Sequence, residues 1–302
     1  MYELDSILKY VDKKQDLDAL YIGLDFLMFT DKRSTMFDFA TSPFNEVNED
    51  QLIARYLVGT SPFKSLSTFR RSFHNQVLAK EHQNGLLDKS KVVTHHIPLF
   101  KKTLKSNFLI NRGTYREYQL DPERLNMLRN AVKRFTSKGT KCHLFINPIH
   151  AYQLEAIHGM GLWEEFQDWK TQLVLMTTEA NLSSDNKVTL WDFAYHNLVT
   201  KEPVRNSPMQ WFWESSHYKQ KTGKLILHRI LGLDNEGNFG LGDRYSMFGQ
   251  RLNQQNINSH LKANNLGHKF YHQSNAKDVD TVMNWIQETS HVHQQAPKRS
   301  FN

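Results

Sequence analysis

The stretch ALYIGLDFLMF, residues 19–29, restricts the possible folds more than any other part of the sequence. It is a short apolar run rich in strand-forming residues, and polar segments lie on both sides of it. Such a run is typical of a strand buried on both faces, as in a parallel sheet. Residues 2–13 place Leu4, Ile7, Leu8 and Val11 on one helical face, which predicts a helix before this strand.

Regular alternation of helices and strands follows from about residue 120. LDPERLNMLRNAVKRFTSKG has Asp121 as a helix N-cap, Pro122 in the first turn and Gly139 at the end. TKCHLFINPIH and KVTLWDFAYH are predicted strands, separated by the helical GLWEEFQDWKTQLVLMTTEA and followed by the helical HYKQKTGKLILHRILG. Helices that join short apolar strands predict an α/β fold with a mainly parallel sheet and right-handed crossovers.

The pattern divides the chain into two predicted units. Residues 1–232 form an α/β domain, interrupted at about residues 30–120 by an irregular and partly helical insertion. Insertions of this length are often functional. Residues 233–302 begin with the Gly-rich DNEGNFGLGD, contain two helical segments and form a peripheral helical C-terminal extension.

Composition excludes several classes of protein. No apolar stretch approaches the roughly 18 residues that a membrane span needs, and the first residues lack the layout of a signal peptide. The chain as written is therefore expected in the cytoplasm. The single cysteine, Cys142, cannot form an internal disulfide.

The formal net charge of +7 raises the question of nucleic-acid binding. The basic residues are spread along the chain in pairs, without zinc-finger spacing or an aromatic-basic RNA-binding signature. We therefore expect no specific nucleic-acid partner. A diffuse positive surface instead suits solubility or attraction to anionic polymers, including acidic polysaccharides.

Polar side chains gather where predicted strands end or a helix begins, and these are Asp25, Asn147, His150, Asp192, Glu214 and His217. Ligands of parallel α/β sheets bind at the carboxyl ends of the strands. Together these residues predict a cleft at that edge. The alternative for each one alone is local: the aspartates cap loops and the histidines cap helices.

The spacing of Glu214 and His217 suits acid–base catalysis. A carboxylate three residues before a histidine can accept a hydrogen bond from Nδ1–H, which leaves Nε2 to take a proton from a hydroxyl nucleophile. The local alternative is that Ser215 or Ser216 caps a helix over residues 218–231, with Glu214 at the positive end of its dipole.

Metal binding is a further possibility, because the chain has 15 histidines. None shows H-E-x-x-H or a comparable ligand spacing with an acidic partner. The sequence therefore predicts no metal site and no other cofactor.

Four motifs in order carry a resemblance to a known family. They are YIGLDFLMF, FINPIHAYQLEAI with LWEEFQDWKTQLV, LWDFAYHNLVTKEPV, and FWESSHYKQKTGKLILHRIL. Over about residues 1–260 the chain resembles the SGNH-hydrolase-like proteins of bacterial envelope and polysaccharide loci. These are distant relatives of the alginate O-acetyltransferase proteins and of the D-alanyl transfer protein of teichoic acid.

The resemblance implies a flavodoxin-like three-layer α/β/α sandwich. It also implies O-acyl transfer or hydrolysis, in which a serine attacks an ester and water or a sugar hydroxyl then takes the acyl group. His217 would be the base and Glu214 its orienting acid, in place of the family's aspartate. Asp25, Asn147 and Asp192 would line the cleft, and Trp213 could stack on a sugar ring of a polysaccharide partner.

The nucleophile is the main departure from the family pattern. The family's serine lies in a turn after a first strand, upstream of the segment that matches residues 21–29. Three explanations stay open: a truncated product, a second polypeptide that supplies the strand, or loss of catalysis. A missing N-terminal segment would place the protein in the envelope or periplasm.

Ser61, in ARYLVGTSPF, is the internal substitute for the nucleophile, because Gly59 and an apolar run precede it. Against it, the run has helical spacing, and Pro62 removes an N–H that an oxyanion would use. Three hypotheses therefore remain: an acyl-ester enzyme, a catalytically inactive or carbohydrate-binding relative, and a basic adaptor for an anionic polymer.

Overall fold

The computed structural model describes residues 1–14, 16–33, 95–110, 114–183, 185, 187–233 and 239–294. The strands are β1 (Ala19–Leu24), β2 (Lys141–Ile146), β3 (Val188–Asp192) and β4 (Gln250–Leu252). The α-helices are α1 (Tyr2–Lys14), α4 (His96–Thr103), α5 (Pro122–Ser137), α6 (Ala151–Gly159), α7 (Trp163–Leu182), α8 (Gln220–Leu231), α9 (Ile257–Ser274) and α10 (Ala276–Gln294). The short helical turns are η1 (Phe26–Phe29), η3 (Leu104–Leu109), η4 (Tyr115–Glu117) and η6 (Gly242–Met247).

A four-stranded sheet in the order β1-β2-β3-β4 forms the centre of the described structure. β1, β2 and β3 are parallel, with Leu24 opposite Ile146 and Ile146 opposite Asp192, whereas β4 runs antiparallel to β3. The predicted α/β class with a mainly parallel sheet is confirmed. The register brings the carboxyl ends of β1, β2 and β3 to one edge.

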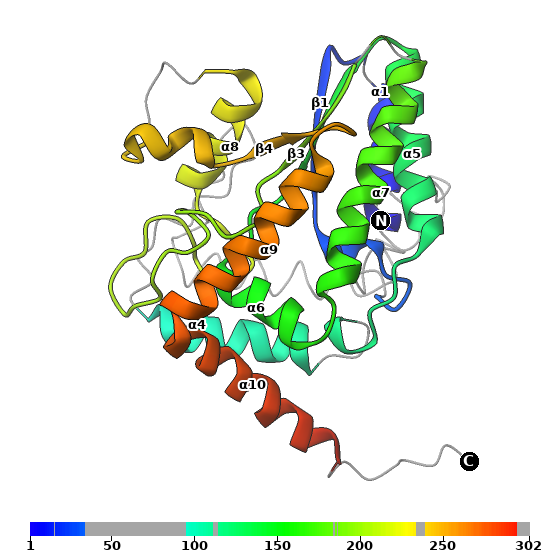
Figure 1. The fold of residues 1–302 in the computed structure, drawn as a ribbon. Helices are drawn as coiled ribbons and strands as arrows, with labels where there is room; N and C mark the ends of the chain where they lie inside the picture. The colour runs from blue at the N-terminus through cyan, green and yellow to red at the C-terminus, as the bar shows by residue number, and fades with distance from the viewer. Residues whose placement is uncertain are drawn as a thin grey trace, which may run out of the picture.

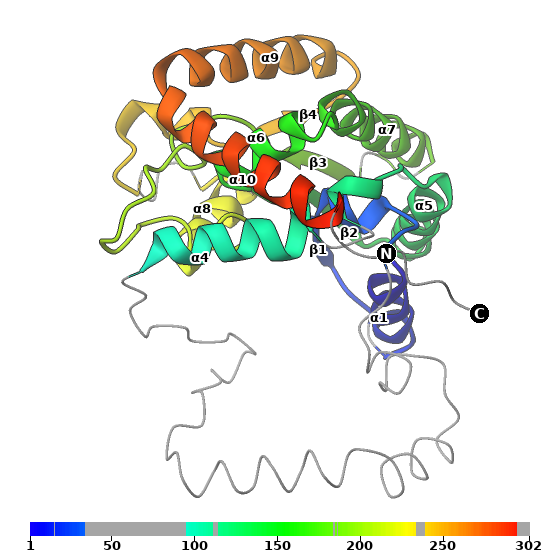
Figure 2. The same ribbon diagram turned by 90° about the horizontal axis from the view of Figure 1, so that it is seen from below.

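Helices pack on both sides of this sheet. Figures 1 and 2 show α1, α5 and α7 together on one side and α8 on the other. The start of α5 is as predicted: the Asp121 carboxylate accepts a hydrogen bond from Glu123 N at 2.9 Å and Pro122 takes the first position. The core between the layers includes the fully buried Leu144, Trp169 and Phe212.

The first strand differs from its prediction. β1 lies at the edge of the sheet, and Tyr21 is exposed while Ile22 and Leu24 are buried. The expectation of burial on both faces is therefore wrong: among the described strands β1 pairs with β2 alone, and its Tyr21 side chain is exposed. The apolar FLMF is not part of the strand either. It forms η1, whose Phe26 and Phe29 pack against Trp169 with ring centroids 5.4 Å away.

The segment beyond residue 232 contributes to the core. β4 extends the sheet, and α10 packs against α6 and η3. The predicted division into a domain and a peripheral extension stays a prediction, but the described part of the extension supplies buried residues such as Leu252 and Val282. Much of the predicted insertion lies outside the described residues. Among the described helices, none combines the length and apolarity of a membrane span.

Candidate active site

A pocket of about 320 Å³ lies at the carboxyl ends of the parallel strands. Leu24 and Ile146, the last residues of β1 and β2, line it together with Asp25 and Asn147, which follow them. His217 reaches the same pocket from the loop before α8. The structure thus brings together Asp25, Asn147 and His217, three of the residues that the sequence analysis selected.

Asp25, Asn147 and Tyr218 form a hydrogen-bonded chain along this pocket. Asn147 Nδ2 donates to Asp25 Oδ1 at 3.0 Å, and the Tyr218 hydroxyl donates to Asn147 Oδ1 at 3.1 Å. Gly23 makes room for the amide, because a Cβ there would lie 2.9 Å from both Nδ2 and Oδ1 of Asn147. The orientation of Asn147 is therefore fixed on three sides.

Glu214 and His217 lie in a tight loop, not in a helix. An antiparallel bridge pairs Phe212 with Tyr218, and Trp213 N donates to His217 O at 2.8 Å. α8 begins only at Gln220, with Lys219 as its N-cap residue. The local alternative, in which Ser215 or Ser216 caps this helix, is therefore wrong.

The loop fixes a carboxylate–imidazole pair. His217 Nδ1 hydrogen-bonds Glu214 Oε1, while Ser216 donates its backbone N–H to Glu214 Oε2 at 3.0 Å. The Glu214 side chain is 6% exposed and that of His217 is 69% exposed. Burial opposes ionisation of Glu214, but the hydrogen bonds from His217 and Ser216 outweigh it and lower the pKa of this carboxyl. With the proton on Nδ1, Nε2 of the neutral ring is the acceptor.

The described lining of the pocket holds one Ser, Thr or Cys side chain, that of Ser216. Its hydroxyl lies 3.0 Å from Glu214 Oε1 and 3.1 Å from His217 Nδ1. It therefore supports the carboxylate side of the pair and not the proton-accepting side. Cys142 is buried in β2, which raises the pKa of its thiol to about 11. Ser61 lies outside the described residues.

The floor of the pocket is aromatic, with two polar atoms among the rings. Phe26, Phe166 and Trp169 line it, as does Gln153 from the first turn of α6. Gln153 donates to the Tyr115 hydroxyl at 2.8 Å, but Gln153 Oε1 and Trp169 Nε1 are buried without a hydrogen-bond partner among the described residues. Both atoms belong to residues of the pocket lining. Gln153 and Trp169 were not predicted, because both lie inside helices.

His150 is buried, and it does not line the pocket. Its Nδ1 accepts from Tyr152 N at 3.1 Å, which caps α6, and its Nε2 donates to Glu202 O at 2.7 Å. Burial lowers the pKa of His150 to about 4, so the ring is neutral. The helix-cap alternative for this residue is confirmed.

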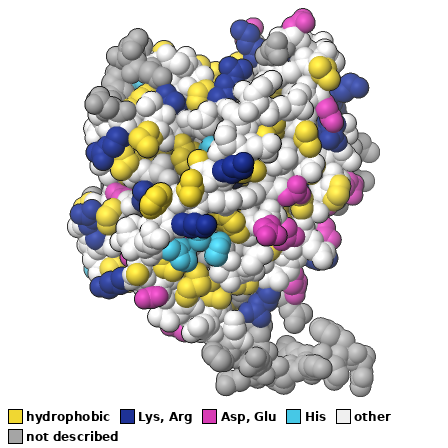
Figure 3. All heavy atoms as spheres, viewed as in Figure 1, with side chains coloured by type: hydrophobic (Ala, Val, Ile, Leu, Met, Phe, Trp, Pro, Cys, Tyr) yellow, Lys and Arg dark blue, Asp and Glu magenta, His cyan; other side chains and the backbone are white. Residues whose placement is uncertain are grey.

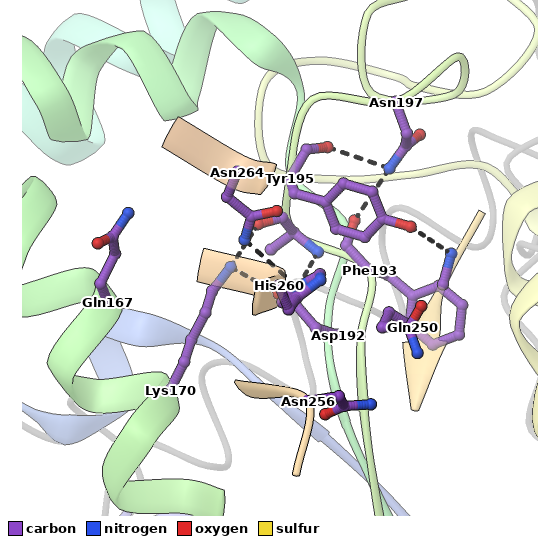
Figure 4. Close-up of polar contacts among 12 residues, drawn as sticks. Gln167, Lys170, Asp192, Phe193, Tyr195, Asn197, Gln250, Asn256, His260 and Asn264 are labelled. Carbon is purple, nitrogen blue, oxygen red and sulfur yellow. Dashed lines mark hydrogen bonds and ion pairs between the residues drawn. The ribbon is translucent and has the colours of Figure 1, made fainter. Parts of the chain in front are cut away.

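Asp192 is fully buried and also does not line the pocket. Figure 4 shows its polar contacts with Lys170 and His260. Lys170 Nζ donates to Asp192 Oδ2 at 2.7 Å and to Ala194 O at 2.7 Å. His260 Nε2 lies 2.8 Å from the same Oδ2, and Asp192 Oδ1 accepts from Ala194 N at 2.8 Å. Burial opposes ionisation of Asp192, but Lys170 and His260 lower the pKa of this carboxyl. Its network holds α7 and α9 to β3.

Trp213 lies beside the loop but outside the pocket lining. The Lys219 ammonium lies 4.4 Å from the centroid of its ring, a cation–π contact. Lys and Arg side chains on the face in Figure 3 are scattered among acidic ones, which argues against a continuous basic surface on that face.

Known proteins offer no point of comparison for this site. No family model, no curated protein and no solved structure matches the chain. What the site can do therefore follows from its own residues: it presents a solvent-accessible histidine, oriented by a buried carboxylate, at a small pocket lined by both aromatic and polar side chains.

Proposed function

We propose that the protein hydrolyses or transfers small O-acyl esters, such as acetyl groups on envelope polysaccharide, with His217 as general base. One observation carries the proposal. The Glu214 carboxylate is buried and holds Nδ1 of a histidine that is itself exposed at the pocket. This is the pairing that prepares Nε2 to accept a proton.

The reaction follows from that pairing. Nε2 of His217 takes the proton of an attacking hydroxyl as its oxygen bonds to the ester carbonyl carbon. The imidazolium, stabilised by Glu214, then returns the proton to the departing alcohol oxygen as the ester C–O bond breaks. In the serine form of this chemistry, a second round with water or a sugar hydroxyl releases the acyl group from the enzyme.

The size and lining of the pocket favour a small acyl group. A volume of about 320 Å³ lies at the lower end of the roughly 300–1,000 Å³ typical of ligand pockets. The aromatic side chains of Phe26, Phe166 and Trp169 in the lining suit a methyl or short alkyl chain. The sheet and its flanking helices are compatible with the flavodoxin-like sandwich expected of such enzymes.

The test is hydrolysis of 4-nitrophenyl acetate by the wild type, His217→Ala and His95→Ala. His95 is an exposed histidine before α4 and controls for unspecific catalysis by surface imidazole. Loss of a general base lowers kcat/KM by about 10²–10⁴-fold. We expect that loss for His217→Ala alone; equal rates for all three proteins would contradict the proposal.

A fluorophosphonate probe identifies the nucleophile. Labelling that disappears in His217→Ala indicates an activated serine, and peptide mapping shows whether it is Ser61. Esterase activity without labelling indicates that His217 activates water directly.

A second candidate is a carbohydrate-binding protein without catalysis. It is favoured by Ser216, since the one serine of the described lining is bonded to Glu214. This candidate predicts no esterase activity and no labelling, together with binding of an O-acetylated oligosaccharide that calorimetry detects.

A further inference from the structure

We propose that α6 and α9 form a binding site for a divalent transition metal of the zinc class, with Glu155, His158, His268 and His272 as ligands. The site is separate from the pocket at the sheet edge, and it does not depend on the proposed esterase activity. Histidine side chains gather at one place on the face shown in Figure 3.

Helical spacing places these side chains in pairs. Glu155 and His158 are three residues apart on α6, and His268 and His272 are four residues apart on α9. Residues at these spacings share one face of a helix. One ring nitrogen from each of the three histidines lies within 4.8 Å of the others.

Glu155 completes the donor set. It is fully buried, and its Oε2 lies 2.5 Å from His272 Nε2 and 3.3 Å from His268 Nε2. Three imidazole nitrogens and one carboxylate oxygen are donors that Zn²⁺ accepts in tetrahedral sites.

His196 has the position of an outer-shell partner. Its Nε2 lies 3.0 Å from Glu155 Oε1, the oxygen that faces away from His268 and His272, and its side chain is 1% exposed. Ligating carboxylates of metal sites are commonly held by such a second hydrogen bond, which fixes their orientation.

His268 is buried beside Glu155, but its Nε2, 3.3 Å from Glu155 Oε2, lacks a well-directed hydrogen bond among the described residues. The residue is 7% exposed. Its ring stacks against His158 at a centroid distance of 4.1 Å and lies 4.3 Å from the ring of His272. Three imidazole rings packed this closely beside one carboxylate are an arrangement that a bound cation would stabilise.

A metal can reach these ligands from solvent. His158 is exposed and the His272 side chain is 35% exposed, whereas Glu155 and His268 form the buried side. Zn–N bonds of about 2.0–2.1 Å need nitrogens about 3.3 Å apart, so the site must contract by rotation of the exposed rings. The bound ion would fasten α9 to the α/β core.

The experiment uses the full chain after dialysis against EDTA and titrates it with Zn²⁺ alone in a calorimeter. We expect one tight site per chain, a higher melting temperature with Zn²⁺, and visible d–d absorption of tetrahedral type when Co²⁺ replaces it. His158→Ala and His272→Ala each remove a ligand from the solvent side. Each should weaken binding by more than the roughly 10–100-fold expected for the outer-shell variant His196→Ala.

His95→Ala is the matched control and should bind Zn²⁺ as the wild type does. Circular dichroism of each metal-free variant shows that the fold is kept, and His272→Gln is the second variant if His272→Ala unfolds. The proposal is overturned if the wild type takes up no stoichiometric Zn²⁺. It is equally overturned if His158→Ala and the folded His272 variant bind Zn²⁺ as tightly as His95→Ala, in which case Glu155 is the centre of an ion-pair cluster.

Discussion

Two carboxylate–histidine pairs lie near the carboxyl edge of the sheet, and their surroundings differ. In the first, Glu214 holds His217, whose side chain is 69% exposed at the pocket. In the second, Asp192 contacts His260, whose side chain is 8% exposed, and Lys170 neutralises the same carboxylate. The contact chemistry is similar, but only His217 can exchange protons with a ligand. A carboxylate–histidine contact therefore indicates a catalytic site only when the histidine reaches a cavity.

The largest expected effect concerns the buried pair. Lys170→Met leaves the Asp192 carboxylate without its ammonium partner and should lower the free energy of unfolding by about 3–5 kcal/mol. Urea denaturation at pH 7 measures this loss. Adding Asp192→Asn removes the unpaired charge and should restore part of the stability. A loss below about 1 kcal/mol would mean that His260 alone neutralises Asp192. The buried pair would then not depend on Lys170, and this difference from the Glu214–His217 pair would be disproved.

Lowering the pH should reduce the free energy of unfolding through the buried His150. His150 has a pKa of about 4 in the folded chain and 6.5 in the unfolded chain, so the unfolded chain binds more protons between these values. Its contribution to stability is full above pH 6.5 and is lost as the pH falls through about 4. The total is about 3 kcal/mol.

His150→Asn tests this sign, because asparagine can still cap α6 but does not titrate. The variant should lose less stability than the wild type between pH 7 and pH 4, measured by urea denaturation at each pH. His95→Ala, which changes an exposed histidine, is the control and should follow the wild-type pH profile more closely. Parallel profiles for wild type and His150→Asn would show that His150 is not a buried neutral ring.

The smallest expected effect compares the two pairs directly at neutral pH. His260→Ala removes a hydrogen bond to a buried charged group and should cost about 1.5–3 kcal/mol of stability. His217→Ala also removes a hydrogen bond to a buried carboxylate, but Ser216 still donates to Glu214 and water can reach the exposed position, so it should cost less, about 0.5–1.5 kcal/mol. Thermal and urea unfolding of both variants measure the difference, and equal losses would place His217 in the packing of the loop.

The positions of most α/β helices and strands are predictable from the sequence. α5, α7, β2 and β3 lie where apolar periodicity and the Asp121–Pro122 start predicted them, because these signals are local. The helix before residue 232 begins two residues later than predicted, since the Phe212–Tyr218 bridge holds the preceding loop. The composition of β1 does not show that it lies at the edge of the sheet. Its position depends on which other strands pair with it, and those are distant in the sequence.

The contact between Glu214 and His217 follows from local sequence, because a spacing of three residues keeps the two side chains within reach in a tight loop. The surroundings of the other polar residues at the ends of the strands depend on long-range packing. Lys170 and His260, which lie 22 and 68 residues away in the chain, bury and neutralise Asp192. Glu155 and His272 are 117 residues apart, so the spacing within α6 and within α9 gives the two pairs but not their meeting. Burial and charge pairing depend on which distant segments pack together, and short-range patterns do not contain that information.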